Sequence, residues 1–256
     1  MRFLIFCFAL IFPGSYVNAA QVAIIIDDIG YRQSDEAVLT LPDNITLSIL
    51  PHTPLGNSVA HIAHERGYEV MLHLPMQALN GKKLGPGGIT NDMSETDIKQ
   101  TISQAFENIP FAKGANNHMG SLLTQLDEPM QWVMESLKQH HLYFVDSMTT
   151  RYTKAGSTAD KLGIPQLKRQ IFLDNDVSPA GLNQQFERLI ALAHRQGQVV
   201  AIAHPHPETI EYLKLNLPRL QQEGISLVKT SELLPYRIAV NKKQQKTGKD
   251  ASIRLK

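Results

Sequence analysis

Short apolar runs alternate with amphipathic segments along most of this chain. The first run, from Ala23 to Ile26, holds three isoleucines and is typical of a strand buried on both faces. Similar runs predict further strands over 45–49, 69–73, 111–115, 142–145, 170–173, 199–203 and 226–228. Segments with a helical period predict helices over 33–41, 55–66, 94–108, 128–140, 179–195 and 208–223. This alternation favours parallel β/α units, and therefore an α/β domain with a parallel sheet.

Three boundaries carry local signals of their own. Ser94 and Asp97 have the spacing of a capping box and predict the start of a helix. Pro75 is expected to end the third strand, which leaves His73 at its carboxyl end. The segment 80–90 has five Gly or Pro among its eleven residues and predicts a long loop, whereas 149–163 indicates only a short helix among loops.

The two ends of the chain differ from the body in composition. Residues 1–20 combine Arg2, an apolar run of ten residues and a small-residue cleavage pattern before Ala20, which predicts a secretory signal peptide and a periplasmic location; a retained anchor is the alternative. The only cysteine, Cys7, lies in this segment, so thiolate chemistry is excluded from the mature chain. Residues 21–236 are expected to form one domain, and 237–256 a basic, disordered tail.

Charge also separates the tail from the body. The whole chain has 25 basic and 24 acidic residues, but the tail from Asn241 carries six of the basic ones against Asp250 alone. The body is therefore mildly acidic, which argues against nucleic acid as a partner. For the tail, contact with anionic polymers or a membrane surface stands beside simple solvation.

Two adjacent carboxylates, Asp27 and Asp28, end the first apolar run, and Gly30 follows them. Successive residues of a strand point to opposite faces, so the two acids are expected to take different roles, one toward a metal and one toward a proton. An Asp-Asp turn relaxed by Gly30 is the structural alternative. No glycine-rich phosphate motif follows this strand, which makes a nicotinamide cofactor unexpected.

The same position, just after a predicted strand, recurs for most candidate chemistry. Aspartate or histidine follows six strands, at Asp27 and Asp28, His73, His118, Asp146, Asp174, and His204 with His206. In a β/α barrel these carboxyl ends meet on one face, where active sites are built. Imidazole and carboxylate ligands suit Zn²⁺, with Fe²⁺, Co²⁺, Ni²⁺ or Mn²⁺ as alternatives. A metal that lowers the pKa of water to about 7 would allow hydrolysis of an amide or ester.

Five segments together resemble the divergent polysaccharide deacetylase family. They are residues 26–30 (Ile-Asp-Asp-Ile-Gly), 67–76, 116–121 (Asn-Asn-His-Met-Gly-Ser), 144–147 and 203–207 (Ala-His-Pro-His-Pro). This family is similar to the NodB-type carbohydrate esterases, so the resemblance implies a distorted (β/α)7 barrel over about 22–234. It also implies a polysaccharide or peptidoglycan-like glycan as substrate and a divalent metal as cofactor, with zinc as the first candidate.

The resemblance implies roles for particular residues. Asp27 matches the general base and Asp28 a metal ligand, while His73 matches the first histidine of the second family motif and His204 the late histidine that acts as general acid. Four residues after His73, where the related enzymes have a second metal histidine, this chain has Gln77. We therefore expect His118 to complete the ligand set.

The arginine motif of the related enzymes is also missing from the 116–121 segment. Asn116 or Asn117 is expected to replace it by hydrogen bonding, and Arg151 to reach in from an adjacent loop. Asp146, Asp174, Asp176 and His206 are expected around the ligands or in the substrate groove, because metal-bound histidines commonly donate their second N–H to a carboxylate. The remaining histidines are expected at the surface or in packing: His52, His61, His64, His140, His141 and His194.

Three hypotheses for function follow. The first is a secreted metal-dependent deacetylase that acts on N- or O-acetyl groups of a cell-envelope glycan. The second is a non-catalytic metal- or glycan-binding envelope protein on the same fold, suggested by the altered ligand set. The third is a solute-binding or structural protein without a metal.

Overall fold

The computed structural model describes residues 19–235. The predicted signal peptide, except its last two residues, and the basic tail lie outside this range. Within it, the strands are β1 (Ala20–Ile29), β2 (Thr46–Ile49), β3 (Glu69–Met76), β4 (Ala112–Met119), β5 (Tyr143–Asp146), β6 (Gln166–Lys168), β7 (Ile171–Phe172), β8 (Gln198–Ala203) and β9 (Ile225–Leu227).

Helices lie between most of these strands. The α-helices are α1 (Gly56–Glu65), α2 (Glu95–Asn108), α3 (Asp127–Gln139), α4 (Ala155–Leu162), α5 (Pro179–Gln196), α6 (Pro207–Asn216) and α7 (Pro218–Gln222). Short 3-10 helices cover Gln33–Thr40, Leu123–Gln125 and Thr230–Leu233. The capping box at the start of α2 is confirmed, since Ser94 Oγ accepts from the Asp97 N–H at 3.2 Å. No helix in 19–235 is long and apolar enough to cross a membrane.

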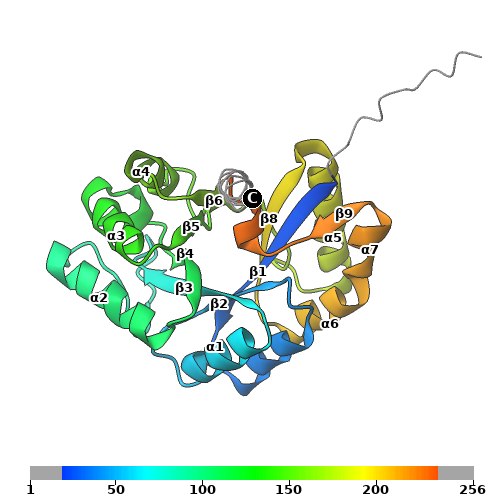
Figure 1. Cartoon of the computed structure of the whole chain (residues 1–256), viewed down its shortest axis with the longest axis horizontal. Helices are drawn as coiled ribbons and strands as arrows, with labels where there is room; N and C mark the ends of the chain where they lie inside the picture. The colour runs from blue at the N-terminus through cyan, green and yellow to red at the C-terminus, as the bar shows by residue number, and fades with distance from the viewer. Residues whose placement is uncertain (1–18, 236–256) are drawn as a thin grey trace, which may run out of the picture.

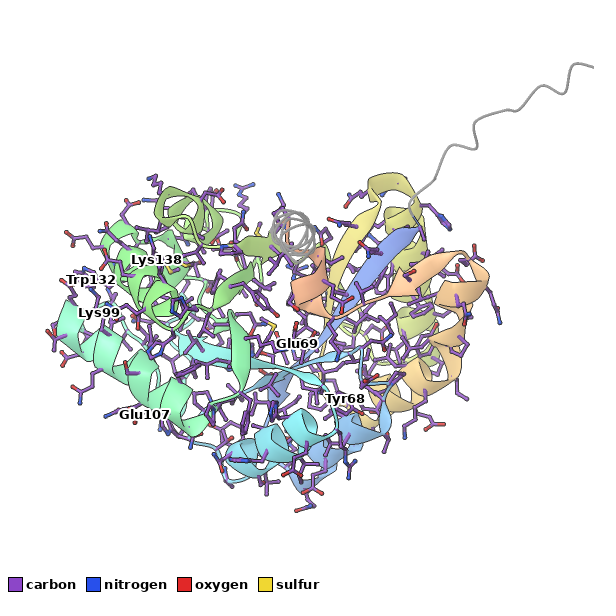
Figure 2. All side chains as sticks on the ribbon, viewed as in Figure 1. Tyr68, Glu69, Lys99, Glu107, Trp132 and Lys138 are labelled. Carbon is purple, nitrogen blue, oxygen red and sulfur yellow. The ribbon has the colours of Figure 1, made fainter. Side chains whose placement is uncertain are left out.

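The strands form one parallel sheet that curls into an open barrel (Figure 1). The strand order is β6-β5-β4-β3-β2-β1-β8-β7, and β9 pairs with the start of β1. The helices cover the outer face. Figure 2 shows Lys99 and Lys138 on these outer helices and Glu69 near the centre of the molecule. The predicted α/β fold, a distorted barrel of parallel strands, is confirmed.

The barrel is open between its edge strands. Within the described residues β6 and β7 form no ladder with each other, and the chain between them crosses the gap instead. There the Arg169 N–H donates to the Asp146 carbonyl and the Gln170 N–H to the Val200 carbonyl, each at 2.9 Å. The connection therefore ties β5 to β8 and places Arg169 inside the opening.

Two apolar layers stabilise this arrangement. The larger lies between the sheet and the helices and includes Ile24, Ile26, Leu72 and Phe144, while a smaller cluster fills the barrel with Ile25, Met71, Val145, Val200 and Ile202, all essentially inaccessible to solvent. Every residue of β2 and β3 is buried. The polar positions of β2, Thr46 and Ser48, face other polar groups inside the barrel rather than solvent.

Some predicted boundaries were wrong. β3 continues through Pro75 to Met76, because β2 pairs with β3 only as far as Leu72 and no hydrogen bond from position 75 to β2 is needed. The single helix expected over 208–223 is split at Leu217 into α6 and α7, because Pro218 cannot donate the next helical hydrogen bond. β6, which was not predicted, adds three residues beside β5.

Candidate metal centre and active site

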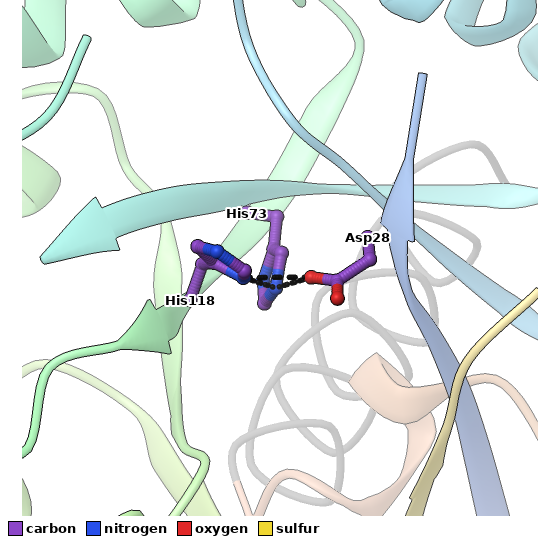
Figure 3. Close-up of side chains that lie close together, drawn as sticks. All are labelled: Asp28, His73 and His118. Atoms are coloured by element: carbon purple, nitrogen blue, oxygen red, sulfur yellow. Dashed lines mark hydrogen bonds and ion pairs between the residues drawn. The ribbon is translucent and has the colours of Figure 1, made fainter. Parts of the chain in front are cut away.

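Three side chains from three strands converge at the carboxyl end of the barrel: Asp28 from β1, His73 from β3 and His118 from β4 (Figure 3). Asp28 Oδ1 lies 2.9 Å from His73 Nε2 and 2.7 Å from His118 Nδ1. The two ring nitrogens are 3.2 Å apart. The residues expected to bind a metal are therefore adjacent, with one ligand atom from each pointing at a common centre.

An irregularity in β1 brings both aspartates to this centre. The pairing of β1 with β2 shifts register between Ile26 and Ile29, and Asp28 has a φ of 61°. A left-handed backbone costs a non-glycine residue roughly 1 kcal/mol, and aspartate tolerates it better than most. As a result Asp27 Oδ2 also faces His73 Nε2, at 3.8 Å. The expectation that the two acids point to opposite faces was wrong, because it assumed a regular strand.

The turn after β1 is held by a carboxylate that the sequence analysis missed as a site residue. Asp35 is buried, and its Oδ2 accepts the backbone N–H groups of Gly30, Tyr31 and Arg32 at 2.9 to 3.0 Å. Gly30 itself has a φ of 131°, and a Cβ there would lie 2.2 Å from Thr53 Oγ1. Both features fix the backbone that carries Asp27 and Asp28.

Asn116 connects the proposed metal ligands to Asp27. It lies on β4, is inaccessible to solvent, and its Oδ1 accepts from Ser48 Oγ at 2.6 Å and from the Nδ1–H of His73 at 2.7 Å. Its Nδ2 donates to Asp27 Oδ1 at 2.8 Å. Because the Nδ1–H of His73 is used on Asn116, the neutral form of His73 carries its lone pair on Nε2, the atom that faces Asp28 and His118.

This chemistry fits a divalent cation. In a tetrahedral site with bonds of about 2.0–2.1 Å, ligand atoms lie about 3.3 Å apart, close to the separations seen here. Two imidazoles and one carboxylate are also a common zinc ligand set that leaves a coordination position open. The three residues therefore have the donor types and spacing that a metal site requires.

The environment shifts the pKa values of these groups in different directions. Burial raises the pKa of Asp27, against the opposing influence of His73 and His204. Burial also disfavours charge on Asp28, but hydrogen bonds with His118 and His73 outweigh it and hold the pKa of Asp28 well below its usual range. The two neighbouring carboxylates therefore differ in basicity, and Asp27 is the better proton acceptor.

A second group of side chains forms the opposite wall: Asp174 after β7, and His204 and His206 after β8. Asp174 Oδ1 lies 3.0 Å from His204 Nδ1, and its Oδ2 accepts from the His204 N–H and from Thr209 Oγ1. Burial alone would lower the pKa of His204, but the hydrogen bond to Asp174 and the nearby charges of Asp174, Asp27 and Asp28 raise it to about 9. Asp174 therefore orients His204 and favours its protonated form.

Both walls line one cleft of about 480 Å³. Its lining includes Asp28 and His118 on one side, Asp174, His204 and His206 on the other, and Tyr31 and Arg32 at its edge. The structure thus brings the expected residues from four strands to one accessible cavity.

Three further residues singled out from the sequence, Gln77, Asn117 and Asp176, lie outside the two clusters. Gln77 is directed to the loop after β3, where its Oε1 accepts from the Asn91 N–H at 2.7 Å. Asn117 does not contact Asp27; it accepts from the Ser147 N–H and donates to the Met119 carbonyl, joining β4 to the loop after β5. Asp176 lies outside both clusters and accepts from the Ser178 N–H at the start of α5.

The positive charge near Asp27 comes from Arg169, which the sequence analysis did not predict, and not from Arg151. The guanidinium of Arg151 contacts the neighbouring Tyr152 on an exposed loop, so the expected role for Arg151 was wrong. Arg169 instead donates to the carbonyls of Ser147 and Met148 and lies 3.7 Å from the Phe172 ring centroid. From there it interacts electrostatically with Asp146 and Asp27.

Asp146 holds the loop after β5 by accepting hydrogen bonds from it. It is buried, and its two oxygens accept from the Met148 N–H and from Thr153 Oγ1. Burial raises its pKa.

The histidines expected outside the site are indeed elsewhere: His61 and His64 pack on Phe111, for example, and His194 pairs with Glu223.

Several known proteins are similar to this chain in sequence or in fold. A family model described as divergent polysaccharide deacetylase matches residues 24–234. The uncharacterised protein YibQ of Escherichia coli (strain K12) is 41% identical over 227 residues, which cover 88% of this chain and 71% of YibQ.

Solved structures share the fold at lower identity. An uncharacterised protein of Agrobacterium tumefaciens C58 has a TM-score of 0.81 at 23% identity, covering 86% of this chain and 92% of that one. The catalytic domain of a peptidoglycan N-acetylglucosamine deacetylase from Eubacterium rectale ATCC 33656 has a TM-score of 0.51 at 11% identity, over 82% and 88% of the two chains. A CE4 family pseudoenzyme from Bacillus anthracis has a TM-score of 0.50 at 13% identity, over 84% and 66%. The family match and the similarity to YibQ together show that the chain belongs to the divergent polysaccharide deacetylase family.

Proposed function

We propose that this protein is a metal-dependent deacetylase that hydrolyses N- or O-acetyl groups of a cell-envelope glycan. The supporting observation is the convergence of Asp28, His73 and His118, with Asp27 beside them and His204 in the same cleft. A divalent cation held by these three side chains, with zinc as the first candidate, would supply Lewis acidity toward the acyl carbonyl and toward water.

Asp27 acts in this proposal as the general base. Asn116 Nδ2 holds its Oδ1 at 2.8 Å, which leaves Oδ2 directed toward the ligand atoms. Burial raises the pKa of the Asp27 carboxyl and so makes it a better acceptor for a proton from the attacking water. His73, His204 and the Asn116 hydrogen bond oppose this increase in the pKa of Asp27, and the charge of Arg169 interacts with the same carboxyl.

His204 acts as the general acid. Its Nδ1 is engaged by Asp174, so Nε2 is the nitrogen available to a substrate. With a pKa raised to about 9, the ring is protonated at neutral pH and can donate to the leaving nitrogen or oxygen of the sugar. The proposed base and acid thus come from different strands and face the same cleft.

The proposal includes the location. Residues 1–20 would direct export and be removed, so that the domain works in the periplasm, where cell-envelope glycans are accessible. Amino-terminal sequencing of the protein from a periplasmic extract should show that the mature chain begins just after Ala19 or Ala20.

A non-catalytic metal- or glycan-binding protein is the second candidate. It is favoured by Gln77, which is directed away from the ligands where related enzymes have a metal histidine, and by the absence of their arginine motif. The fold is compatible with this function too, since the similar Bacillus anthracis protein is described as a pseudoenzyme.

Acetate release separates the two candidates. The protein loaded with zinc, cobalt, nickel or manganese should release acetate from acetylated chito-oligomers, xylan or peptidoglycan fragments. Asp27→Asn should lower the rate by about 10²- to 10⁴-fold while the bound metal stays unchanged. No release from any of these glycans with any of these metals would support the binding protein.

A further inference from the structure

Exposed apolar side chains are concentrated at the end of the barrel that holds the cleft. Four large ones stand out in residues 19–235, and three of them follow strands at their carboxyl ends: Tyr31 after β1 (48% exposed), Leu79 after β3 (65%) and Tyr152 after β5 (58%). The fourth, Leu215, lies on α6. Tyr31 also lines the cleft, so this side chain belongs to the accessible surface beside the candidate site.

Cationic side chains accompany the aromatic ones. Arg32 follows Tyr31, and the Arg151 guanidinium lies 4.7 Å from the centroid of the Tyr152 ring. Lys82 and Lys83 lie on the loop after β3. Among the described residues, the ion pairs formed by Lys or Arg involve Lys99, Lys154 and Arg219, so these four cations have no carboxylate partner there.

Tyr31 lies between the cleft and the loop after β3 that carries Lys82 and Lys83. Tyr31 and Arg32 line the cleft, while Lys82, Lys83 and Gly85 line a neighbouring hollow of about 560 Å³. A Cβ added at Gly85 would lie 2.5 Å from Tyr31 Oη, which shows that the two surfaces meet at this side chain. A chain-like ligand could therefore extend from the metal centre past Tyr31 toward the lysines.

The acidic groups that line the cleft do not neutralise this surface. Asp35 is buried against three backbone N–H groups, and Asp174 is buried against His204 and Thr209. Asp28 is directed toward His73 and His118. Along this path Arg32, Lys82 and Lys83 therefore remain free to pair with an anionic ligand.

We propose that this surface, formed by Tyr31, Arg32, Lys82 and Lys83, binds a glycan that carries carboxylate groups. Sugar rings pack against the Tyr31 ring, and the carboxylates pair with the cations. The inference rests on the proposed function, since it identifies the class of glycan that would reach the metal centre. It can nevertheless be tested without hydrolysis.

Binding of acetyl-free oligomers provides that test. Calorimetric titration of the full chain with oligogalacturonate should give an affinity at least about tenfold higher than with a neutral cello-oligosaccharide of equal length, at low salt. Raising the salt to about 0.5 M should remove most of the difference by screening. Equal affinities for the two oligomers would overturn the proposal, whereas failure of acetate release would overturn only the enzymatic function.

Matched variants locate the contact. Lys82→Ala/Lys83→Ala should lower the affinity for oligogalacturonate about three- to tenfold. Lys113→Ala/Lys161→Ala, which removes two exposed lysines at the other end of the barrel, should leave it unchanged. An equal effect of both double variants would contradict the proposed surface. So would loss of binding on addition of a chelator, because the anion would then be held by the metal rather than by the lysines.

Discussion

The two ends of this barrel both contain buried polar side chains, but they match hydrogen-bond donors and acceptors differently. At the carboxyl end, Asp28, His73 and His118 direct three ligand atoms at one another within 3.2 Å. At the amino end, Glu69 Oε1 accepts from Tyr143 Oη at 2.8 Å, from the Ser231 N–H at 2.9 Å and from Thr46 Oγ1 at 3.4 Å.

The difference shows what distinguishes a functional polar cluster from a structural one. Glu69 Oε1 meets three donors, and the 3-10 helix Thr230–Leu233 covers the cluster; within this cluster Glu69 Oε2 has no hydrogen-bond partner among residues 19–235. Around His73, three possible ligand atoms from three strands converge on one another, and the cluster opens to a cleft. Burial of charge is common to both, so convergence of ligand atoms beside an accessible cleft is the better indicator of a cation site.

Removing one residue from each cluster tests this contrast most strongly. His73→Ala should lower zinc affinity by more than about a hundredfold, because the loss of a ligand exceeds the effect of altering its supporting residues. Glu69→Gln, at a position equally buried in the same strand, should retain zinc with unchanged stoichiometry. Elemental analysis and calorimetric titration measure both. Full zinc binding by His73→Ala would place the metal elsewhere.

Asn116 and Asn117 give a finer comparison within the carboxyl end. Asn116→Ala frees the His73 ring to change tautomer and should weaken metal binding by about 10- to 100-fold. Asn117→Ala removes hydrogen bonds to Ser147, Met119 and Thr149 and none to the proposed ligands, so it should lower stability and leave metal affinity near the wild-type value. If the two variants bind zinc equally well, Asn116 does not position the ligand.

The pH dependence of stability should report on the wall of the cleft opposite the proposed metal ligands. Since the pKa of His204 is raised from 6.5 to about 9 in the folded protein, its contribution is complete below pH 6.5 and is lost as the pH rises through about 9. After discounting for partial exposure, the loss is about 1–2 kcal/mol in the metal-free protein. Chemical denaturation at pH 6 and pH 9.5 measures it. Asp174→Asn should flatten the dependence, and an unchanged slope would contradict the assigned pair.

The smallest expected effect is on stability and concerns the cluster around Glu69 at the amino end. Tyr143→Phe removes one donor to Glu69 and should cost about 1–2 kcal/mol of unfolding free energy. Because the cluster lies at the amino end, acetate release and zinc affinity should not change. A large loss of either, in a variant that remains folded at the assay temperature, would show that the two ends are coupled.

Hydrophobic patterning predicted most of the fold. The parallel strands over 23–26, 69–73 and 199–203 and the helices between them were found close to their predicted places, because fully buried strands and amphipathic helices have distinct local patterns. The errors lie where a long-range partner decides. Pro75 does not end β3, since β2 has already ended beside it, and the short strand β6 has little pattern of its own and depends on pairing with β5.

The site was only partly predictable for a related reason. Their position after strands was enough to predict that the aspartates and histidines gather at one end of the barrel, because parallel strands bring their carboxyl ends together, and the family resemblance then selected Asp28, His73 and His118 as one group. Arg169 and Asp35 were missed as site residues. Arg169 reaches Asp27 only because the β6–β7 connection crosses the open side of the barrel, and Asp35 matters only because the chain turns back onto Gly30.

The sequence by itself thus determined which chemistry is present: the alternation that builds a parallel barrel and the aspartates and histidines that follow its strands. Tertiary structure decided how they are used. The irregularity in β1 turns both Asp27 and Asp28 toward His73, and the amide of Asn116 connects His73 to Asp27 from another strand. Strand periodicity is a local property that the sequence records, whereas bulges and hydrogen bonds between distant strands depend on partners that only the folded chain brings together.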